Sequence, residues 1–271
     1  MRQTPASAST GQRQGVLSMT HDEIITAGAQ RLVEAYERHT QIPLPEDIPL
    51  TEAQDAYDIQ ERVSAHSGTP SGWKLGGIIK GEVSRFSRLF SEQSHHSPAR
   101  LARNNYHRVF LEPELAVVLG GDLPAREAPY TLEEVAAQVA SLHAAIEVVD
   151  SRFESWPEVP PLWQLADGLS HGGFVLGSSV DGGNLRQMKD AVYRLSLNGD
   201  VALSGRGDHP GGDPALLLMQ MINTRIAASG VGFHAGEVIT TGTFNGVLEM
   251  QRGHSARLVF EAIGEVELIL D

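Results

Sequence analysis

The chain contains 271 residues, of which 41% are hydrophobic and 20% charged, a composition ordinary for a soluble globular protein with one large domain or a small and a larger one. Its net charge of −13 argues against sequence-independent binding to nucleic acid or anionic lipid. The sequence has no cysteine, which excludes disulfides, thiolate zinc sites and cysteine nucleophiles. No apolar run approaches the roughly 20 residues that span a bilayer, so we expect a cytoplasmic protein.

The N-terminal residues 1–19 are predicted to be a disordered tail. They are rich in Ser, Thr, Gln and Gly and lack the apolar core of a secretion signal. Met19 is a candidate for the functional start.

Residues 20–70 are predicted to form a small helical N-terminal lobe. Residues 20–23 (THDE) match a capping box ahead of apolar residues at helical spacing. Residues 51–54 (TEAQ) open a second helix, which is expected to end near Gly68. Neither helix carries a residue with an evident chemical role, so we expect the chemistry in residues 71–271, which form a β-rich catalytic domain.

The motif at residues 71–77 (SGWKLGG) draws attention to Lys74. The chain has only three lysines, Lys74, Lys80 and Lys189, among 21 Lys and Arg residues, so its generic surface cation is arginine. Lysine offers a compact ammonium that suits catalysis; the alternative is a lysine at a strand end whose charge reaches solvent. The polar stretch 78–103 is predicted to be an irregular loop that could cover a pocket.

Residues 109–119 (VFLEPELAVVL) predict a buried strand that carries two carboxylates. Because side chains alternate between the faces of a strand, Glu112 and Glu114 point the same way. Two acids on an apolar strand repel each other and resist dehydration, and a hard cation that prefers oxygen ligands would stabilise them. The alternative, a strand end with its acids facing solvent, is equally compatible with this stretch alone.

A third carboxylate, Glu147, lies in the apolar run of residues 144–152 (AAIEVVDSR). Upstream, residues 131–134 (TLEE) match a capping box, and the apolar spacing predicts a helix that continues into this run. Together with the two acids of the strand, Glu147 indicates an octahedral oxygen site for magnesium or manganese. Asp150 and Arg152 form a candidate ion pair that either supports this site or is a plain salt bridge.

Residues 168–172 (GLSHG) match G-x-S-x-G and raise a rival hypothesis, a serine hydrolase with Ser170 as the nucleophile. In such enzymes the motif lies on a sharp turn that leaves a buried strand, whereas the preceding residues 162–167 are polar and typical of a helix. Chance matches to three fixed positions are common in a glycine-rich chain, so this hypothesis is the weaker one.

The C-terminal third is predicted to be β structure with one helix. Residues 192–198 form a strand that leads into an Asn-Gly turn, a strong hairpin signal. Residues 213–230 form a helix that starts with Asp-Pro and ends at glycine. A strand and a polar turn follow at residues 236–243, and residues 257–270 form a closing hairpin.

Four motifs, in this order, resemble those of the fumarylacetoacetate hydrolase superfamily: GWKLG (72–76), EPE (112–114), IEVVDSR (146–152) and TTGT (240–243). The resemblance runs from about residue 20 to the C-terminus and is greatest to the branch of 2-keto-4-pentenoate hydratases and 4-oxalocrotonate decarboxylases. It implies an α+β fold, a mixed β-roll with a small helical N-terminal lobe. The hydrolase branch usually has aspartate where this chain has Glu147, which favours a hydratase or decarboxylase over a fumarylacetoacetate-type carbon–carbon hydrolase.

The resemblance also implies roles for single residues. A divalent cation, usually magnesium, would be held by three carboxylates: Glu112, Glu114 and Glu147. The cation would chelate a 2-oxo or 2-hydroxydienoic acid and stabilise its enolate, while Lys74 binds substrate or moves protons. Ser170 and Thr243 would contact the substrate. The implied enzyme is a 2-keto-4-pentenoate-type hydratase, with a 4-oxalocrotonate-type decarboxylase as the alternative because both share these ligands, and we expect a homo-oligomer.

The chain departs from this branch at three places. An Asp-aromatic-Gly turn after the lysine motif reads Arg85-Phe-Ser here, an Asp-Asn-Ala-Ser run reads DGLS (167–170), and Asp213 replaces a usual His or Asn. Arg85 is therefore a candidate partner for an extra substrate carboxylate. A family member that keeps the fold without catalysis is a further alternative, against which the complete set of three acids argues.

Overall fold

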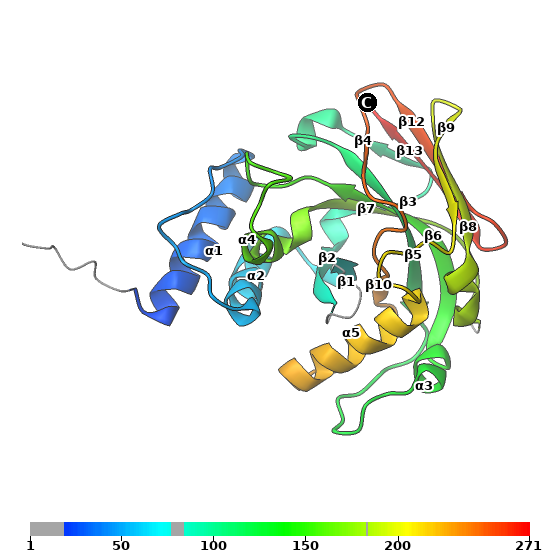
Figure 1. Cartoon of the computed structure of the whole chain (residues 1–271), viewed down its shortest axis with the longest axis horizontal. Coiled ribbons are helices and arrows are strands. Elements are labelled where there is room, and N and C mark those ends of the chain that lie inside the picture. The colour runs from blue at the N-terminus through cyan, green and yellow to red at the C-terminus, as the bar shows by residue number, and fades with distance from the viewer. Residues whose placement is uncertain (1–18, 77–83, 183) are drawn as a thin grey trace, which may run out of the picture.

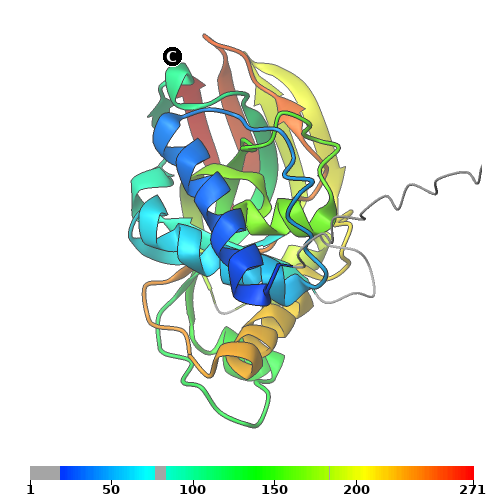
Figure 2. The ribbon, with the colours of Figure 1, turned by 90° about the vertical axis from the view of Figure 1, so that its left-hand side faces the viewer.

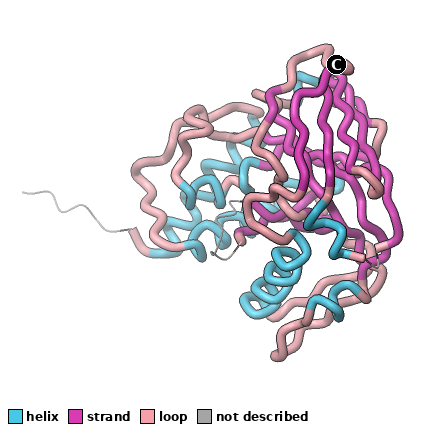
Figure 3. Tube along the Cα trace, turned by 45° about the vertical axis from the view of Figure 1, so that its right-hand side comes forward, coloured by secondary structure: helices cyan, strands magenta, loops and turns pink. Residues whose placement is uncertain are grey.

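The computed structural model describes residues 19–76, 84–182 and 184–271, so the expected tail at residues 1–18 lies outside the described residues. Two curved β-sheets dominate this part of the chain, and the helices lie around them (Figure 1). In Figure 3 the strands gather into one curved body with helices on its outside. The mixed α+β roll expected from the sequence is confirmed.

The larger sheet has the strand order β2-β1-β10-β5-β6-β7-β3, and β11 pairs with β5 beside β10. Its central strands β5 and β6 are antiparallel neighbours over almost their full lengths. The strands are β1 (Pro70–Gly76), β2 (Arg85–Phe90), β3 (Ser94–His96), β5 (Phe110–Leu119), β6 (Val139–Val149), β7 (His171–Asp181), β10 (Val238–Thr240) and β11 (Leu248–Glu249).

The smaller sheet has the order β4-β13-β12-β8-β9. The predicted Asn-Gly hairpin joins β8 to β9, and the predicted closing hairpin joins β12 to β13. The strands are β4 (Ala99–Leu101), β8 (Val192–Leu197), β9 (Asp200–Arg206), β12 (Ser255–Phe260) and β13 (Gly264–Leu270).

Five α-helices accompany the sheets in the described ranges: α1 (His21–Arg38), α2 (Ala53–Ser67), α3 (Leu132–Ala136), α4 (Pro161–Ala166) and α5 (Pro214–Ser229). Figure 2 shows α1 lying across α2 on the face that is turned to the left in Figure 1. Among the residues that the structure describes, no helix combines the length and the hydropathy needed to cross a membrane.

Apolar side chains form two main cores. The larger core contains the inward residues of β5 and β6, such as Leu115 and Ile146, together with residues of β12, β13 and α5. The second core joins α1 and α2 to Phe153, Trp163 and Leu169, which come much later in the chain. The helical lobe is therefore stabilised by packing against the segment around α4 as well as by its own two helices.

The helix predicted to follow residues 131–134 is much shorter than expected. The capping box is confirmed, because Thr131 and Glu134 bond each other's backbone N–H groups, but α3 ends at Ala136 and strand β6 begins at Val139. The apolar spacing was misleading because β6 pairs with β5 on one side and β7 on the other. Buried on both faces, its residues 144–149 are all apolar except Glu147, a run whose period does not distinguish helix from strand.

Two smaller predictions also need correction. Residues 84–103 are not an irregular loop, because they contain three strands: β2 pairs with the preceding strand β1, and β3 and β4 pair with the distant strands β7 and β13. Residues 78–83 of the expected lid lie outside the described ranges. The cap of α2 is closed one residue later than predicted. Asp55, not Gln54, accepts the backbone N–H groups of Thr51 at 2.7 Å and Glu52 at 3.1 Å.

Candidate metal centre

Strands β5 and β6 bring the three predicted carboxylates together. Glu112 lies directly opposite Glu147 in the antiparallel register, which places two acids side by side on one face. Glu114 is two residues along β5 and therefore shares that face. One carboxylate oxygen from each of the three acids can be chosen so that all lie within 4.8 Å of one another.

This cluster is buried in a way that disfavours three negative charges. Glu114 and Glu147 are fully buried and Glu112 is partly buried. Burial and then the neighbouring Glu147 raise the pKa of Glu112 to about 8, and the same two causes raise the pKa of Glu114 well above its usual range. Both oxygens of Glu114 and Oε2 of Glu147 have no hydrogen-bond partner among the residues that the structure describes. Such buried acceptors are unfavourable unless a positive group faces them, so the donor set fits a hard divalent cation.

Lys74 reaches this cluster from β1. Its side chain is 2% exposed, and its Nζ donates to Oε1 of Glu147 and, at 3.1 Å, to the carbonyl oxygen of Leu169. Burial by itself would raise the pKa of Glu147, but Lys74 and His171 hold that pKa below its usual range. Three ionised carboxylates and one ammonium leave two negative charges, which a divalent cation would balance.

His171 is a site residue that sequence reasoning missed. It opens β7, is buried, and its Nδ1 lies 3.2 Å from Oε1 of Glu147. Burial lowers the pKa of His171, although Glu147 opposes this effect. The available signal was the GLSHG motif, in which the histidine stands next to the serine. Its contact with Glu147 depends on the pairing of β7 with β6, which the motif does not reveal.

The turn before His171 has an unusual backbone. Gly168, Leu169 and Ser170 all have positive φ angles, of 61°, 58° and 59°. A leucine in this region is a conformational outlier, and such strain is concentrated at functional sites. Here the turn presents the carbonyl of Leu169 to Lys74.

Ser170 does not have the surroundings of a serine nucleophile. It is buried, and its Oγ has no hydrogen-bond partner, whereas a nucleophile needs a base within hydrogen-bond reach. The adjacent His171 directs its Nδ1 to Glu147 instead. The segment before the motif is α4 and a helical turn rather than a buried strand. Ser170 also lies outside the lining of the cavity beside the acids, so its substrate contact remains a prediction.

A cavity of about 230 Å³ opens beside the acids. Among the described residues, its polar side chains are Lys74, Glu112, Gln164 and Thr243. Thr243 uses its hydroxyl to donate to the carbonyl of Gly246 at 2.9 Å. Most of the remaining wall is apolar: Leu75, Val149, Trp156, Pro157, Leu169, Pro210 and Val247.

Arg85 and Asp213, two of the departures from the family pattern, lie elsewhere. The Arg85 guanidinium donates to the carbonyl of Pro161 at 3.2 Å, and the residue does not line the cavity. Asp213 caps α5 by accepting the N–H of Ala215 at 3.1 Å. The second of these substitutions therefore has a structural explanation, a helix cap.

A larger cavity, of about 600 Å³, lies between α2, α5 and the β1–β2 pair. Its two arginines are already engaged: Arg88 pairs with Glu61 at 3.1 Å, and Arg225 donates to two backbone carbonyls while stacking on Trp73. The smaller cavity is lined by Glu112, which clusters with Glu114 and Glu147, so we place the chemistry there.

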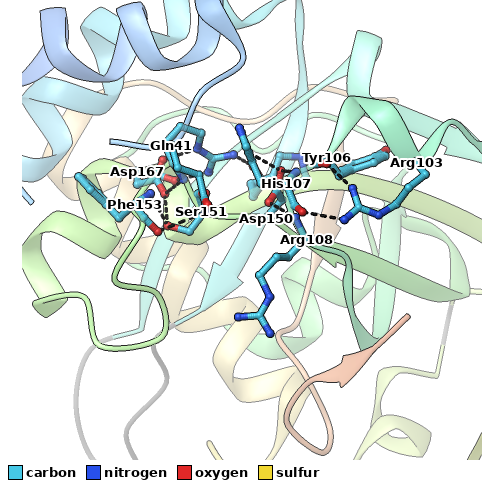
Figure 4. A network of polar contacts seen from close by, with 11 residues as sticks. Gln41, Arg103, Tyr106, His107, Arg108, Asp150, Ser151, Phe153 and Asp167 are labelled. Carbon is cyan, nitrogen blue, oxygen red and sulfur yellow. Dashed lines mark hydrogen bonds and ion pairs between the residues drawn. The ribbon is translucent and has the colours of Figure 1, made fainter. Parts of the chain in front are cut away.

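A polar network follows directly after β6 (Figure 4). Arg152 does not pair with Asp150 as the sequence suggested. It forms a buried ion pair with Asp167, with Nε 2.5 Å from Oδ1, and donates to the carbonyl of His171 at 2.7 Å. Asp150 instead accepts the backbone N–H groups of His107 and Arg108. The segment after Glu147 is thereby fixed to two other parts of the chain.

Comparisons with known proteins agree with this geometry. The family model for the fumarylacetoacetate (FAA) hydrolase C-terminal domain matches residues 89–269. The 2-hydroxyhexa-2,4-dienoate hydratase of Comamonas testosteroni is 28% identical over 260 residues, covering 91% of this chain and 97% of that protein. The 2-keto-4-pentenoate hydratase of Paraburkholderia phymatum is 28% identical over 261 residues, covering 92% and 98%.

A solved structure shares the fold at lower sequence identity. The 4-oxalocrotonate decarboxylase from Pseudomonas putida G7, complexed with magnesium and adipate, superposes with a TM-score of 0.81 at 21% identity, covering 94% of this chain and 99% of that one. Because the family model matches about two thirds of the chain, including the strands β5 and β6 that carry all three acids, the chain belongs to the fumarylacetoacetate hydrolase family.

Proposed function

We propose that this protein is a divalent-metal-dependent lyase that hydrates a 2-hydroxydienoic or 2-oxo acid, as a 2-keto-4-pentenoate-type hydratase does. The observation that carries the proposal is the convergence of Glu112, Glu114 and Glu147, of which Glu114 and Glu147 keep buried oxygens without a partner among the described residues, while Glu112 and Lys74 line a cavity. The two hydratases with similar sequences support it.

The three glutamates would hold Mg²⁺ or Mn²⁺, which prefer oxygen ligands. When bound, the cation would supply Lewis-acid stabilisation of the negative charge that develops on the substrate's carboxylate and 2-oxygen. The chain itself supplies a buried, water-poor face on which the acids are held by the β5–β6 register.

Lys74 is proposed to hold or move a proton at the substrate. An ammonium has three donors, and Lys74 uses two of them for Glu147 and the Leu169 carbonyl. The third can face the cavity, which Lys74 lines. Gln164 and Thr243 line the same cavity and are candidates to bind the attacking water or the substrate.

The cavity wall favours hydration of a monoacid over decarboxylation of a diacid. Of its residues that the structure describes, Lys74 is the one cationic side chain, and it is already paired with Glu147. Among these residues a second substrate carboxylate would therefore meet the neutral Gln164 and Thr243 and apolar side chains but no unpaired cation, which is unfavourable for a buried charge. Arg85, the candidate for such a partner, binds the Pro161 carbonyl instead. A 4-oxalocrotonate-type decarboxylase would use the same ligands and remains the alternative.

The test is to offer purified, metal-free protein a 2-hydroxydienoic monoacid and 2-oxo-hexenedioate, each with and without Mg²⁺, and to measure hydration and carbon dioxide release separately. We expect Mg²⁺-dependent hydration of the monoacid and no effect of a serine-directed reagent. Carbon dioxide release from the diacid as the main reaction would show the decarboxylase instead, and turnover in the presence of excess chelator would contradict the metal-dependent mechanism.

Three wider properties are also proposed: a cytoplasmic location, a homo-oligomeric state and a division of the chain near residue 70. The sequence-based arguments support the first two, and light scattering of the purified protein measures the second. The separate core around α1 and α2 supports the third, although part of that core comes from residues 153–169.

A further inference from the structure

We propose that His171 is a positioning residue of the metal centre, whose ring fixes Glu147 so that the Oε2 atom of this carboxylate faces the cation. The inference rests on the proposed function, because it assumes that Glu112, Glu114 and Glu147 bind a divalent ion. None of the motifs that led to the family contains this histidine.

The contacts of Glu147 are divided unequally between its two oxygens. Oε1 accepts from Lys74 and lies 3.2 Å from Nδ1 of His171, while Oε2 is buried and has no partner in the described ranges of the chain. Rotating the carboxylate would break both contacts with Oε1. Two donors on one oxygen therefore leave the other as the atom available to a metal ion, and they favour binding through a single oxygen.

The ring of His171 is itself held in place. Its residue is 2% exposed, and its carbonyl accepts Nη1 of Arg152 at 2.7 Å, while Arg152 is fixed by Asp167. The next residue, Gly172, allows the strand to approach closely, because a Cβ there would lie 2.8 Å from Cβ of Asp150. The backbone at the start of β7 thus has little freedom, and within the described part of the chain the imidazole has one polar contact, the one with Glu147.

Lys74 alone is a less suitable anchor for Glu147. Its ammonium lines the cavity and is the proposed contact of the substrate, so its bond to Glu147 can weaken when the substrate binds. His171 does not line the cavity. It can therefore hold the carboxylate throughout the reaction, in the manner of outer-shell partners that orient metal ligands.

The experiment compares His171→Asn with His171→Gln. The amide nitrogen of asparagine can occupy the place of Nδ1, whereas that of glutamine reaches the place of Nε2, so only the first keeps a donor toward Glu147. Calorimetric titration of the metal-free proteins with Mn²⁺ and with Mg²⁺ measures the affinity directly, without any substrate. Thermal melts without metal establish that each variant is folded. The same two substitutions at the exposed His96 of β3 are the matched controls.

We expect His171→Gln to bind the ion about 10- to 100-fold more weakly, the range typical for loss of an outer-shell partner, and His171→Asn to remain within a few-fold of the wild type. Equal affinities for both variants, whether normal or weakened, would overturn the inference, because a packing role does not distinguish the two amides. A wild-type protein that binds neither ion would overturn the proposed function and this inference with it.

Discussion

Glu114 is the residue whose surroundings are hardest to explain without a cation. It is fully buried, neither of its oxygens has a hydrogen-bond partner among the described residues, and its pKa is raised well above the usual range by burial and by Glu147 and Glu112. An unsatisfied buried polar group is unfavourable by about 1–3 kcal/mol, and more when charged. The residue therefore reduces the stability of the metal-free fold, which is understandable only if it has a role in binding.

Glu114→Gln tests that role. The amide keeps the shape of the side chain but removes one anionic ligand, so added Mg²⁺ should stabilise the wild type and not the variant. At a concentration of 100 times the dissociation constant, binding to the folded state adds about 2.7 kcal/mol. Melting temperatures measured with and without Mg²⁺ check this. Glu261→Gln, an exposed position on the β12–β13 turn, is the control, and a normal Mg²⁺-induced shift in Glu114→Gln would contradict the site.

At this scale the sequence predicts the residues whose chemistry is unusual for their local surroundings. Glu112, Glu114 and Glu147 were recognisable as acids in apolar runs, and Lys74 as a rare lysine between glycines. The structure does place these four together. His171 was not recognisable because its contact with Glu147 depends on strand pairing, and Arg85 was assigned to the pocket although its guanidinium reaches the Pro161 carbonyl.

Among the secondary-structure elements, those with specific end signals were predicted best. Capping residues placed the starts of α1, α3 and α5, and the Asn-Gly turn placed the β8–β9 hairpin. These signals depend on hydrogen bonds within a few residues. The end of α3 and the strands β2, β3 and β4 were missed because they depend on pairing with other strands, which for β3 and β4 are distant in sequence. Local composition does not reveal such pairing.

The cap of α3 also leads to a prediction about how the stability of the fold depends on pH. Arg126, through both terminal nitrogens, and the Thr131 backbone N–H lower the pKa of Glu134 to about 2. Since the folded-state pKa lies below the ordinary value of about 4.3, this carboxylate stabilises the fold above that value, and the contribution is lost as pH falls toward 2. The difference in melting temperature between wild type and Glu134→Gln should therefore be largest near pH 7 and narrow below about pH 4.3.

Melting curves at a series of pH values measure this difference. Glu127→Gln, at an exposed position in the loop that precedes α3, controls for the general effect of removing one negative charge from an acidic protein. A wild-type advantage that stayed constant from pH 7 to pH 3 would show that the cap does not depend on the ionised carboxylate.

Across the whole molecule, one short segment connects the helical lobe to the metal centre. Residues 150–153 follow β6 directly, and their backbone bonds Gln41 and Ile42 of the lobe. Within the same segment Arg152 binds Asp167 and the His171 carbonyl. Movement of the lobe relative to the sheets would therefore displace Glu147 and His171, so the lobe helps to hold the site in place.

Asp167→Asn tests this connection. The substitution leaves the buried guanidinium of Arg152 without its counter-charge, and breaking a buried pair on one side is unfavourable by about 3–5 kcal/mol. Urea denaturation followed by tryptophan fluorescence measures the loss in the free energy of unfolding. Asp190→Asn, at an exposed position, is the matched control. A loss below about 1 kcal/mol, the scale of an exposed pair, would show that Asp167 does not hold the segment.

The placement of the three acids on two adjacent strands has an evolutionary consequence. The three ligands lie on the paired strands β5 and β6, whereas Trp156, Gln164 and Val247, which line the cavity, come from the loops and from α4. Mutations in these wall residues can accumulate without disturbing the cation site, so a duplicated copy of the protein could acquire a new substrate while it keeps the old chemistry. Among relatives that share the three acids, the wall residues are therefore the better guide to which acid each one accepts.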